Sequence, residues 1–440
     1  MTSNEEIVGA LIAKARAAQK QVENYTQEQI DEVALSVAWQ VYRDDNIAAC
    51  AKIAVEETGM GIYEDKLTKH KVKVLGVCRD IKHAKTVGVI ERDEARGLTK
   101  YAKPVGVIGA LTPVTNPTAT AASNGTGILK GRNAVIFAPH PAAKRSCALV
   151  CGFMREGLRR VGAPVDLVQY IEEPSVPLSQ ELMRQVDLVL ATGGSVMVKA
   201  AYSSGKPAYG VGAGNPVIIV AEDADLGDAA QKIRISKTFD NATSCSSDNS
   251  LLIQEGVFDR MVVELRKQGG YLCSSEEKKK LENWMWVASA KTGHVALNSK
   301  IIAISARRIA KDAGIAVPDE TRMLMVIGDK PGEERFSGEK LSPVMALWRY
   351  GTIDGPSGSS TSFTITPVWA IPAGSIPSIP NISERWPWRP RSAASWSVRP
   401  TRRPPAATFI TPCPPRSRWD AGHGAVTLRR RTSTGNILST

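Results

Sequence analysis

The sequence predicts an α/β protein built around a doubly wound, largely parallel sheet. Between about residues 101 and 221, short apolar runs alternate with segments whose apolar residues recur at helical spacing. Such alternation of strand and helix is typical of parallel sheets with helices on both faces. The chain has 440 residues, of which 43% are hydrophobic, and this is enough for two or three domains with a substantial core.

The amino-terminal segment is predicted to be helical. Ser3 and Asn4 precede two glutamates, as at many helix starts, and Thr26 followed three residues later by Gln29 indicates a capping box. Apolar residues follow one face of each predicted helix: Ile7, Leu11, Ile12 and Ala15 in the first, and Ile30, Val33, Ala34, Val37 and Val41 in the second. We therefore expect two amphipathic helices to open the chain.

The alternating part comes next. Apolar runs predict strands at residues 103–111, 133–139, 166–171, 186–192 and 215–221, and helical periodicity predicts helices at 117–130, 147–160 and 196–204. In a sheet of this kind, ligands bind beyond the carboxyl ends of the strands. The residues that follow each strand are therefore the candidates for a cofactor site.

One of these turns contains Thr192, Gly193, Gly194 and Ser195 and leads into a predicted helix. Free backbone N–H groups and the helix dipole favour a phosphate group at such a position, so the turn is a candidate pyrophosphate site. An ordinary tight turn between strand and helix would explain the same residues. No G-x-G-x-x-G fingerprint follows the other strands, so the sequence lacks a standard Rossmann motif.

The segment KTFDNATSCSSDNS, residues 237–250, sets Cys245 among small hydroxyl and amide side chains. Structural cysteines usually have apolar neighbours, whereas polar neighbours favour a thiol near solvent, where the thiolate can form and attack a carbonyl carbon. Cys245 is therefore a candidate nucleophile. The alternative is an inert loop cysteine.

The cysteines as a set indicate neither a disulfide framework nor a zinc site, because the seven are scattered along the chain without C-x-x-C spacing. The sequence shows no amino-terminal signal pattern and no apolar run long enough for a membrane span. We therefore expect a cytoplasmic protein without a bound metal.

The positive charge is concentrated near the carboxyl terminus. The net charge is +12, but residues 356–440 hold eleven arginines, no lysine and two acidic residues, which leaves +3 for residues 1–355. That body is close to neutral and has no basic helix with interleaved aromatic residues. Nucleic-acid binding is therefore not expected.

Residues 356–440 also hold 13 of the 26 prolines and five of the nine tryptophans. Such proline density is incompatible with regular helix or central strand, and disordered extensions are normally poor in tryptophan. When the bases encoding Trp369 to Pro372 are regrouped two positions later, they spell glycine, then His, Asn, Asp or Tyr, then Ser, Thr or Pro. The composition therefore predicts a frameshift between about Gly355 and Thr361 followed by a disordered tail. The alternative interpretation is a disordered extension translated in the correct frame.

Several motifs together resemble the aldehyde dehydrogenase superfamily, and within it the CoA-acylating branch. They are KPVGVIGALTPVTNPTAT, ILKGRNAVIFAPHP, LVLATGGS, GKPAYGVGAGNPVIIV, FDNATSC and EKLSPV, in family order over about residues 3–350. The resemblance implies an NAD(P)-binding domain over 1–220, with an oligomerisation arm near 88–103, and a catalytic domain over 221–355. It also implies a homo-oligomer, although the altered tail leaves the catalytic domain incomplete and puts the oligomer in doubt.

By this resemblance, Cys245 forms a thiohemiacetal with an aldehyde and then, after hydride transfer, a thioester. The Asn116 side-chain amide donates to the oxyanion beside the Cys245 N–H. Glu339 holds the nicotinamide ribose of NAD or NADP. Apart from the resemblance, Asn116 before a proline indicates a turn residue, and Glu339 a solvated surface charge.

The remaining cofactor contacts follow the same resemblance. The turn over residues 192–195 matches the phosphate-binding turn. His140 stands where hydrolytic members have a lysine near the adenosine ribose. The choice between NAD and NADP therefore stays open.

The fate of the thioester is inferred from a missing carboxylate. Hydrolytic members carry a water-activating glutamate at a position near Gly210, but no Asp or Glu occurs between Asp187 and Glu222. A thiol ionises more readily than water and needs less help from a general base. The resemblance therefore implies coenzyme A as co-substrate and acyl-CoA as product. A hydrolytic enzyme that releases the free acid is the alternative.

The small hydroxyl residues around Cys245 are most similar to those of acylating enzymes that act on sulfoacetaldehyde, with acetaldehyde and propionaldehyde enzymes as close relatives. A sulfonate would need an arginine or several N–H donors, which the sequence does not identify. The family's Gly-x-Gly-His-Ser/Thr motif would fall in the tail, where the alternative frame of residues 367–372 can spell it. We therefore expect the chain as written to be weakly active or inactive, and a catalytically dead nucleotide-binding remnant is a third interpretation.

Overall fold

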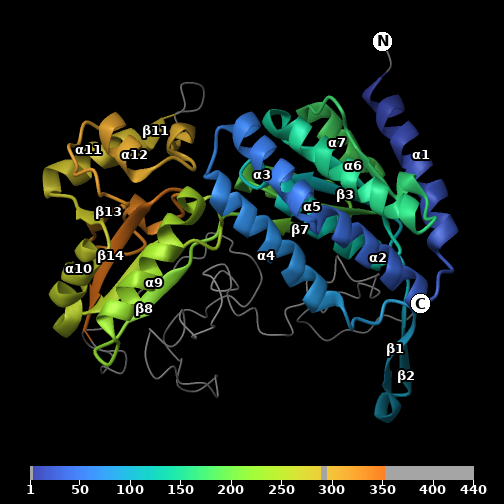
Figure 1. Cartoon of the computed structure of the whole chain (residues 1–440), viewed down its shortest axis with the longest axis horizontal. Coiled ribbons are helices and arrows are strands. Elements are labelled where there is room, and N and C mark those ends of the chain that lie inside the picture. The colour runs from blue at the N-terminus through green and yellow to red at the C-terminus, as the bar shows by residue number, and fades with distance from the viewer. Residues whose placement is uncertain (1–2, 289–294, 352–440) are drawn as a thin grey trace.

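The structure is a computed structural model that describes residues 3–288 and 295–351. Two five-stranded sheets, each packed with helices, lie side by side along the long axis of the molecule (Figure 1). The predicted frameshift, the tail over 356–440 and the predicted Gly-His-Ser motif lie outside the described residues. Within the described ranges, no helix is both long enough and apolar enough to cross a membrane.

Four helices form the amino-terminal part: α1 (Asn4–Val22), α2 (Gln27–Tyr42), α3 (Asp44–Thr58) and α4 (Tyr63–Ile81). Both predicted helix starts are confirmed, because Ser3 and Thr26 each form a complete capping box. The buried face predicted for α2 is confirmed as well. On α1 the predicted face is only partly right: Ala15 is buried and Leu11 and Ile12 are partly buried, but Ile7 is exposed and its neighbour Val8 is buried instead.

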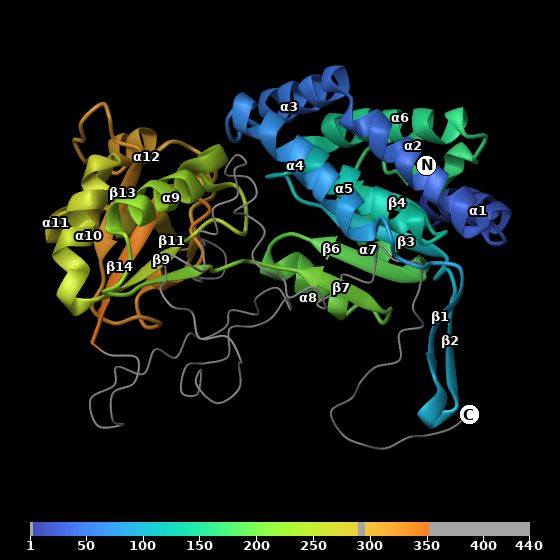
Figure 2. The same ribbon diagram turned by 60° about the horizontal axis from the view of Figure 1, so that its bottom comes forward.

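A two-stranded antiparallel ribbon follows, formed by β1 (Gly88–Asp93) and β2 (Leu98–Ala102). It projects away from the body of the molecule (Figure 2). Leu98 and Tyr101 are exposed on it. The ribbon spans the segment near 88–103 for which the resemblance implies an oligomerisation arm.

The first large sheet consists of β3 (Val107–Thr112), β4 (Ala134–Pro139), β5 (Val168–Tyr170), β6 (Leu188–Thr192) and β7 (Ala208–Val211). The strand order is β5-β4-β3-β6-β7 and every pair is parallel. The winding direction reverses between β3 and β6, so the carboxyl ends of these two strands lie together at the switch point where such sheets bind ligands.

The helices that connect these strands are α5 (Pro117–Lys130), α6 (Lys144–Arg160), α7 (Val176–Gln185) and α8 (Ser195–Tyr202). The predicted strands within residues 103–192 and the predicted helices at 117–130, 147–160 and 196–204 are therefore confirmed, with small differences at their ends. Helix α5 begins at Pro117, where the absent N–H of proline leaves no helical hydrogen bond unmade.

The second large sheet consists of β8 (Val217–Val220), β9 (Ser250–Gln254), β10 (Gly270–Leu272), β13 (Met323–Ile327) and β14 (Val344–Tyr350). Its order is β10-β13-β14-β9-β8, again all parallel. The other elements of this half are α9 (Leu226–Thr238), α10 (Phe258–Lys267), α11 (Ser275–Met285), α12 (Ala306–Asp312) and the small ribbon of β11 (Trp286–Ala288) and β12 (Val295–Leu297).

One predicted strand lies in a different sheet from the one expected. The run at residues 215–221 does form a strand, β8, but it pairs with β9 in the second sheet rather than continuing the first. An apolar run indicates that a strand is buried, yet it carries no information about which neighbour the strand pairs with. The two sheets therefore separate between β7 and β8, slightly before the boundary at residue 220 that the sequence suggested.

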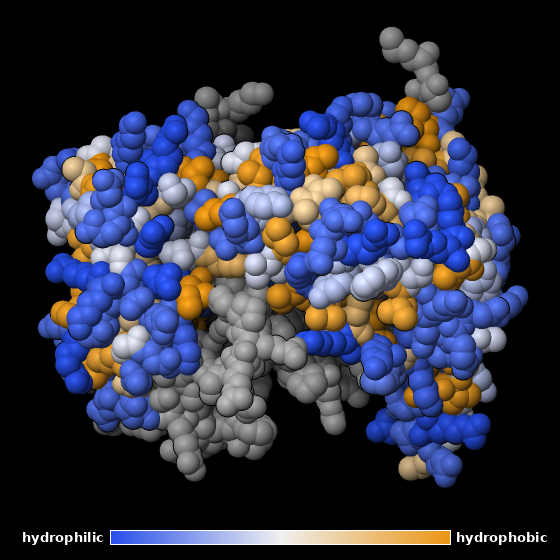
Figure 3. All heavy atoms as spheres, viewed as in Figure 1, coloured by the Kyte–Doolittle hydropathy of each residue, from blue (hydrophilic) through white to orange (hydrophobic). Residues whose placement is uncertain are grey.

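The second sheet is buried on both faces, as expected for a parallel sheet. Met323 and Met325 of β13 belong to the apolar cluster beneath α9 and α10, whereas Leu324 and Val326 belong to the cluster beneath α11 and α12. This alternation follows the pleat of the strand. On the face of the molecule shown in Figure 3, hydrophilic residues predominate and hydrophobic ones are scattered among them.

Candidate active site

The candidate site begins at the switch point of the first sheet. Asn116 follows β3 at the start of α5, and the turn over residues 192–195 follows β6, which pairs directly with β3. Two predicted site segments, far apart in the sequence, thus lie at the same edge of one sheet.

The second sheet brings three further residues together at the amino ends of neighbouring strands. Gly214 precedes β8, Cys245 precedes β9 and Glu339 precedes β14, and these strands are adjacent in the sheet. The Gly214 N–H donates to Glu339 Oε1 at 3.0 Å. A Cβ on Gly214 would lie only 2.0 Å from the carbonyl oxygen of Cys245. The backbone at residue 214 therefore packs directly against the cysteine.

Asn116 connects the two halves. Its Nδ2 donates to the carbonyl oxygen of Thr243 at 3.2 Å, two residues before Cys245. A second, weaker contact from Nδ2 reaches the Thr115 hydroxyl at 3.4 Å. The amide predicted to stabilise an oxyanion thus lies next to the segment that carries the predicted nucleophile.

Cys245 is half-buried rather than fully open to solvent. Burial raises the pKa of its thiol above the ordinary value, and Glu339 raises it further, whereas Lys73 and Lys69 favour the thiolate. The expectation of a thiol near solvent is therefore met only in part. Polar neighbours are present, but they are themselves packed, since Thr243, Ser244 and Ser247 are buried.

The segment before Cys245 has an unusual backbone. Asp240, Asn241 and Ala242 all have φ near +50 to +58°, a left-handed conformation that residues other than glycine seldom adopt. Such a turn persists only where surrounding contacts hold it. The contacts come from α4: Lys66 and Lys69 both form ion pairs with the fully buried Asp240 carboxylate.

These lysines were missed by the sequence analysis. Lys69 Nζ also donates to Asn116 Oδ1 at 2.8 Å and to the Thr243 hydroxyl at 2.6 Å. Lysines at helical spacing normally indicate a solvated face, and nothing in the local sequence of α4 distinguishes this pair from such a face.

Glu339 lies in a second buried group of ionisable residues. Burial raises its pKa from 4.5 to about 7, although the Gly214 N–H, Lys237 and Lys340 act in the opposite direction. Burial lowers the pKa of Lys237 to about 7, against the influence of Asp248 and Glu339. Glu339 is therefore not the solvated surface charge that its sequence context alone would allow.

Asn249 organises this second group. Its Oδ1 accepts the Lys340 N–H at 3.2 Å and lies 3.4 Å from Lys237 Nζ. Its Nδ2 contacts the carbonyl oxygen of Gly214 at 3.4 Å. One amide thus ties together the segments before β8, β9 and β14.

The predicted phosphate turn is accessible. Gly194 is exposed at the N-cap of α8, and a Cβ placed on it would meet no atom within 4 Å. Ser195 begins the helix and is exposed, while Thr192 and Gly193 are partly exposed. The N–H groups of this first turn are available to a ligand, because the cap has no side-chain hydrogen bond.

His140 follows β4 at the same edge of the sheet and is exposed. Its Nδ1 accepts the Ala142 N–H at 3.1 Å, and partial burial lowers the pKa of the ring. The structure places it beside the switch point but shows no contact between it and the turn over residues 192–195.

The strand position near Gly210 has no room for a carboxylate. A Cβ there would lie 2.5 Å from a methyl group of Val198 and 2.8 Å from the Tyr202 ring. The Gly210 N–H is already bonded to the Tyr202 hydroxyl at 3.0 Å. A water-activating carboxylate could not be accommodated at Gly210 without displacing the Val198 and Tyr202 side chains.

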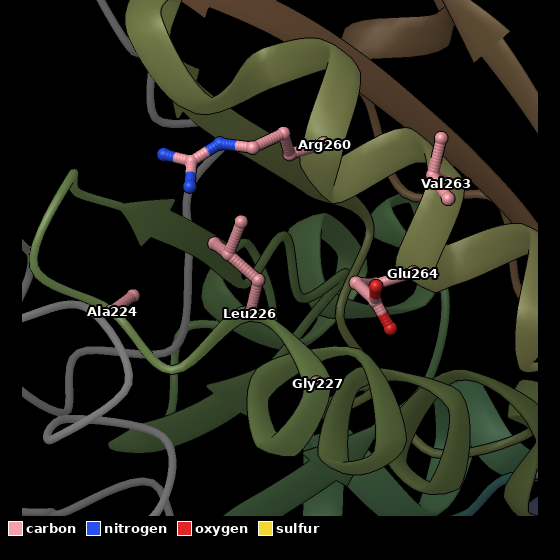
Figure 4. A pocket seen from close by; sticks show the side chains of 6 residues that line it. All are labelled: Ala224, Leu226, Gly227, Arg260, Val263 and Glu264. Carbon is pink, nitrogen blue, oxygen red and sulfur yellow. The ribbon is translucent and has the colours of Figure 1, made fainter.

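A surface hollow of about 500 Å³ lies elsewhere, between the start of α9 and α10. Figure 4 shows Leu226, Arg260 and Glu264 around it. None of the predicted site residues lines it. The grouping of Asn116, Cys245 and Glu339 is therefore the better candidate for chemistry.

Comparison with known proteins gives a consistent result. The sequence model of the aldehyde dehydrogenase family matches residues 1–274. A sulfoacetaldehyde dehydrogenase of Acholeplasma sp is 59% identical over 340 residues, which cover 77% of this chain and 70% of that one. An acylating sulfoacetaldehyde dehydrogenase of Bilophila wadsworthia is 54% identical over 336 residues, 76% of this chain and 72% of that one.

Solved structures give the same fold. An acetylating aldehyde dehydrogenase of Geobacillus thermoglucosidasius superposes with a TM-score of 0.74 at 40% identity, over 80% of this chain and 76% of that one. A propionaldehyde dehydrogenase of Rhodopseudomonas palustris with bound propionyl-CoA superposes with a TM-score of 0.70 at 30% identity, over 79% of this chain and 75% of that one.

Proposed function

The chain belongs to the aldehyde dehydrogenase family, and we propose that it is a CoA-acylating member that oxidises a small aldehyde with NAD or NADP. The observation that carries the proposal is that the Asn116 amide donates to Thr243, two residues before Cys245, while Gly214 packs against the Cys245 backbone and donates to Glu339. A nucleophile, an oxyanion donor and a ribose-binding carboxylate are the groups that this chemistry needs.

The switch point suits a dinucleotide. The turn over residues 192–195, together with the open amino-terminal turn of α8 that begins at Ser195, would hold the pyrophosphate. Glu339 would accept hydrogen bonds from the nicotinamide ribose. His140 would lie on the adenosine side. Bound there, the nicotinamide ring supplies an acceptor for hydride. NAD and NADP stay equally open as cofactors.

The chain's own residues carry the covalent steps. The Cys245 thiolate, once its proton has passed to water, attacks the aldehyde carbon and forms a C–S bond. The carbonyl oxygen becomes an oxyanion, with Asn116 Nδ2 and the Cys245 N–H beside it. After hydride has left the carbon, the oxyanion electrons restore the C=O bond and a thioester remains on Cys245.

Coenzyme A, rather than water, is the proposed acyl acceptor. No carboxylate occurs between Asp187 and Glu222, and the position near Gly210 is closed by Val198 and Tyr202. The CoA thiolate attacks the thioester carbon, and the Cys245 sulfur leaves as thiolate. A thiolate leaving group needs no proton, so the step proceeds without a general acid.

We propose sulfoacetaldehyde as the substrate. Two relatives at 59% and 54% identity carry that activity in their names. The charge around the nucleophile is mixed, because Lys73 and Lys69 favour an anion at Cys245 whereas Glu339 disfavours one. The similarity to these two relatives therefore carries the choice of substrate.

The test is an assay with NAD or NADP, with and without CoA, and with sulfoacetaldehyde, acetaldehyde and propionaldehyde in parallel, following absorbance of the reduced cofactor. We expect turnover that requires CoA and is highest with sulfoacetaldehyde. Equal turnover without CoA would establish the hydrolytic alternative. Cofactor binding without any burst of reduced cofactor would establish the inactive remnant.

We also propose that residues after about 355 are translated out of frame. The match to the Acholeplasma relative covers 340 residues, 77% of this chain, and leaves 30% of that relative unmatched, as a change of frame would. The assay is therefore run on the 440-residue chain and on a chain whose frame is restored after Gly355, and we expect activity mainly in the second.

The two sheets suggest a division into two domains, and the β1–β2 ribbon suggests a means of oligomerisation. We assign the NAD(P)-binding domain to the chain up to β7 and the catalytic domain to the chain from β8 to about residue 355, which moves the boundary predicted at residue 220 to the segment between these two strands. The β1–β2 ribbon would be the oligomerisation arm of a homo-oligomer in the cytoplasm. Size-exclusion chromatography of the restored-frame chain, with and without residues 88–102, tests the arm.

A further inference from the structure

Helix α4 contributes two lysines to the interior of the candidate site. Lys66 and Lys69 are each only 5% exposed, although lysine is rarely buried unless it is paired. Both contact Asp240, which is fully buried and lies five residues before Cys245. Burial alone would raise the pKa of Asp240, but Lys69 and Lys66 hold it below the ordinary value. The three groups therefore form a charged triad.

The two lysines have different third partners. Lys66 Nζ donates to the backbone oxygen of Thr115 at 3.0 Å. Lys69 Nζ donates to the side-chain oxygen of Asn116 at 2.8 Å and to the Thr243 hydroxyl at 2.6 Å. Lys66 therefore holds the backbone of Thr115, whereas Lys69 contacts the Asn116 amide itself.

We propose that Lys69 is a positioning residue for acylation of Cys245, acting through Asn116. The inference rests on the roles proposed above for those two residues. The Lys69 ammonium can only donate hydrogen bonds, so the Asn116 side chain must turn its Oδ1 toward Lys69. Nδ2 is then directed toward the Thr243 carbonyl and the space beside Cys245.

The same contact strengthens Asn116 as a donor. A cation hydrogen-bonded to the amide oxygen draws electron density from the nitrogen, and bonds in such a chain reinforce one another at low dielectric. Asp240 and Asp65 both lie beside the two lysines, and the Asp65 carboxylate accepts the Asp240 N–H at 2.7 Å. The effect expected of Lys69 is therefore that of its direct contact with Asn116 and not that of a net positive charge.

The test separates oxyanion stabilisation from thiolate formation on the same sulfur. Acylation of Cys245 by p-nitrophenyl acetate passes through a tetrahedral oxyanion: the thiolate attacks the carbonyl, and p-nitrophenolate leaves. Alkylation by iodoacetamide displaces iodide and forms no oxyanion. Neither reaction needs an aldehyde, a nicotinamide cofactor or CoA. The 440-residue chain can therefore be used, and failure of the proposed aldehyde chemistry would not obscure the result.

Lys69→Met and Lys66→Met form a matched pair, because each removes one buried cation from Asp240 but only the first removes a contact to Asn116. We expect Lys69→Met to lower the acylation rate relative to the alkylation rate by roughly 10²-fold, the scale of a misplaced catalytic group. Lys66→Met should change that ratio by less than about threefold. Equal ratios in the two variants would overturn the proposal.

A double-mutant cycle gives a second readout. If Lys69 acts through Asn116, Lys69→Met should have little further effect on the ratio when Asn116→Ala is already present. Multiplicative effects of the two substitutions would contradict the proposal. If Lys69→Met does not fold, the double variant Lys69→Met/Asp240→Asn takes its place, because it removes both members of the ion pair. Lys66→Met/Asp240→Asn is then the control. The ratio of acylation to alkylation must still fall in the first double variant and not in the second.

Discussion

Replacing Gly214 with alanine is expected to inactivate the site without altering any charged or hydrogen-bonding group. The added Cβ would lie 2.0 Å from the Cys245 carbonyl oxygen and 2.8 Å from its carbonyl carbon, whereas ordinary contacts begin at 3.4 Å. The cysteine backbone must therefore move by more than about 1 Å. Because a displacement of about 1 Å can cost ~100-fold in rate, we expect a loss of that order in acylation of Cys245.

The assay is the burst of p-nitrophenolate from p-nitrophenyl acetate, together with CoA-dependent turnover of the restored-frame chain. Overpacking should also destabilise the fold by about 1–3 kcal/mol, which a urea melt would detect. The matched control is Gly76→Ala within α4, where a Cβ would meet nothing within 4 Å and where alanine should stabilise the helix by about 0.5–1 kcal/mol. Parental acylation by the Gly214→Ala chain would refute the close packing on which the site is built.

Three other substitutions follow from the same contacts. Asn116→Ala removes the oxyanion donor and should lower acylation of Cys245 by about 10²–10³-fold in the p-nitrophenolate burst, with alkylation by iodoacetamide much less affected. Gly210→Glu should not create CoA-independent turnover, because the Val198 and Tyr202 side chains fill the space that the new carboxylate would need. The substitution should instead lower the midpoint of urea unfolding. Formation of free acid as fast as the parental chain forms acyl-CoA would contradict the prediction. Glu339→Gln should alter the pH dependence of stability. The folded chain keeps a proton on Glu339 up to a pKa of about 7, whereas the unfolded chain releases it near 4.5, so the stability of the parental chain falls by up to about 3 kcal/mol as pH rises between these values. Urea melts of the parental and Glu339→Gln chains at about pH 4.5 and pH 8 should therefore differ in their pH dependence by that amount. The same pH dependence in both chains would contradict the prediction.

Much of the fold was accessible from the sequence because local signals and burial agree. Thr26 and Gln29 define a helix start by chemistry that acts within one turn, and both the start and the buried face of α2 were predicted. Strands β3 to β6 appear as apolar runs because they are buried on both faces. Strand β8 was assigned to the wrong sheet, since pairing depends on partners distant in the sequence.

The candidate site was predictable only where a residue lies within a motif. Cys245 was found by its polar neighbours and then by the resemblance, whereas Asn116 and Glu339 were found by the resemblance alone. The structure places Asn116 and Glu339 around the segment of the cysteine. Lys69 was not found. It acts more than 170 residues upstream of Asp240, and its burial results from the packing of α4 against the left-handed turn. A charged residue on a helix gives no sign in the sequence that tertiary packing will bury it.

The most direct measurement of the central claim is mass spectrometry of the peptide containing Cys245. The restored-frame chain is incubated with sulfoacetaldehyde and NAD or NADP, first without CoA and then with it. A mass increase equal to the acyl group should appear on Cys245 in the first step and disappear in the second as acyl-CoA forms. Steady formation of reduced cofactor while that peptide stays unmodified, or an unchanged rate in Cys245→Ala, would contradict the account.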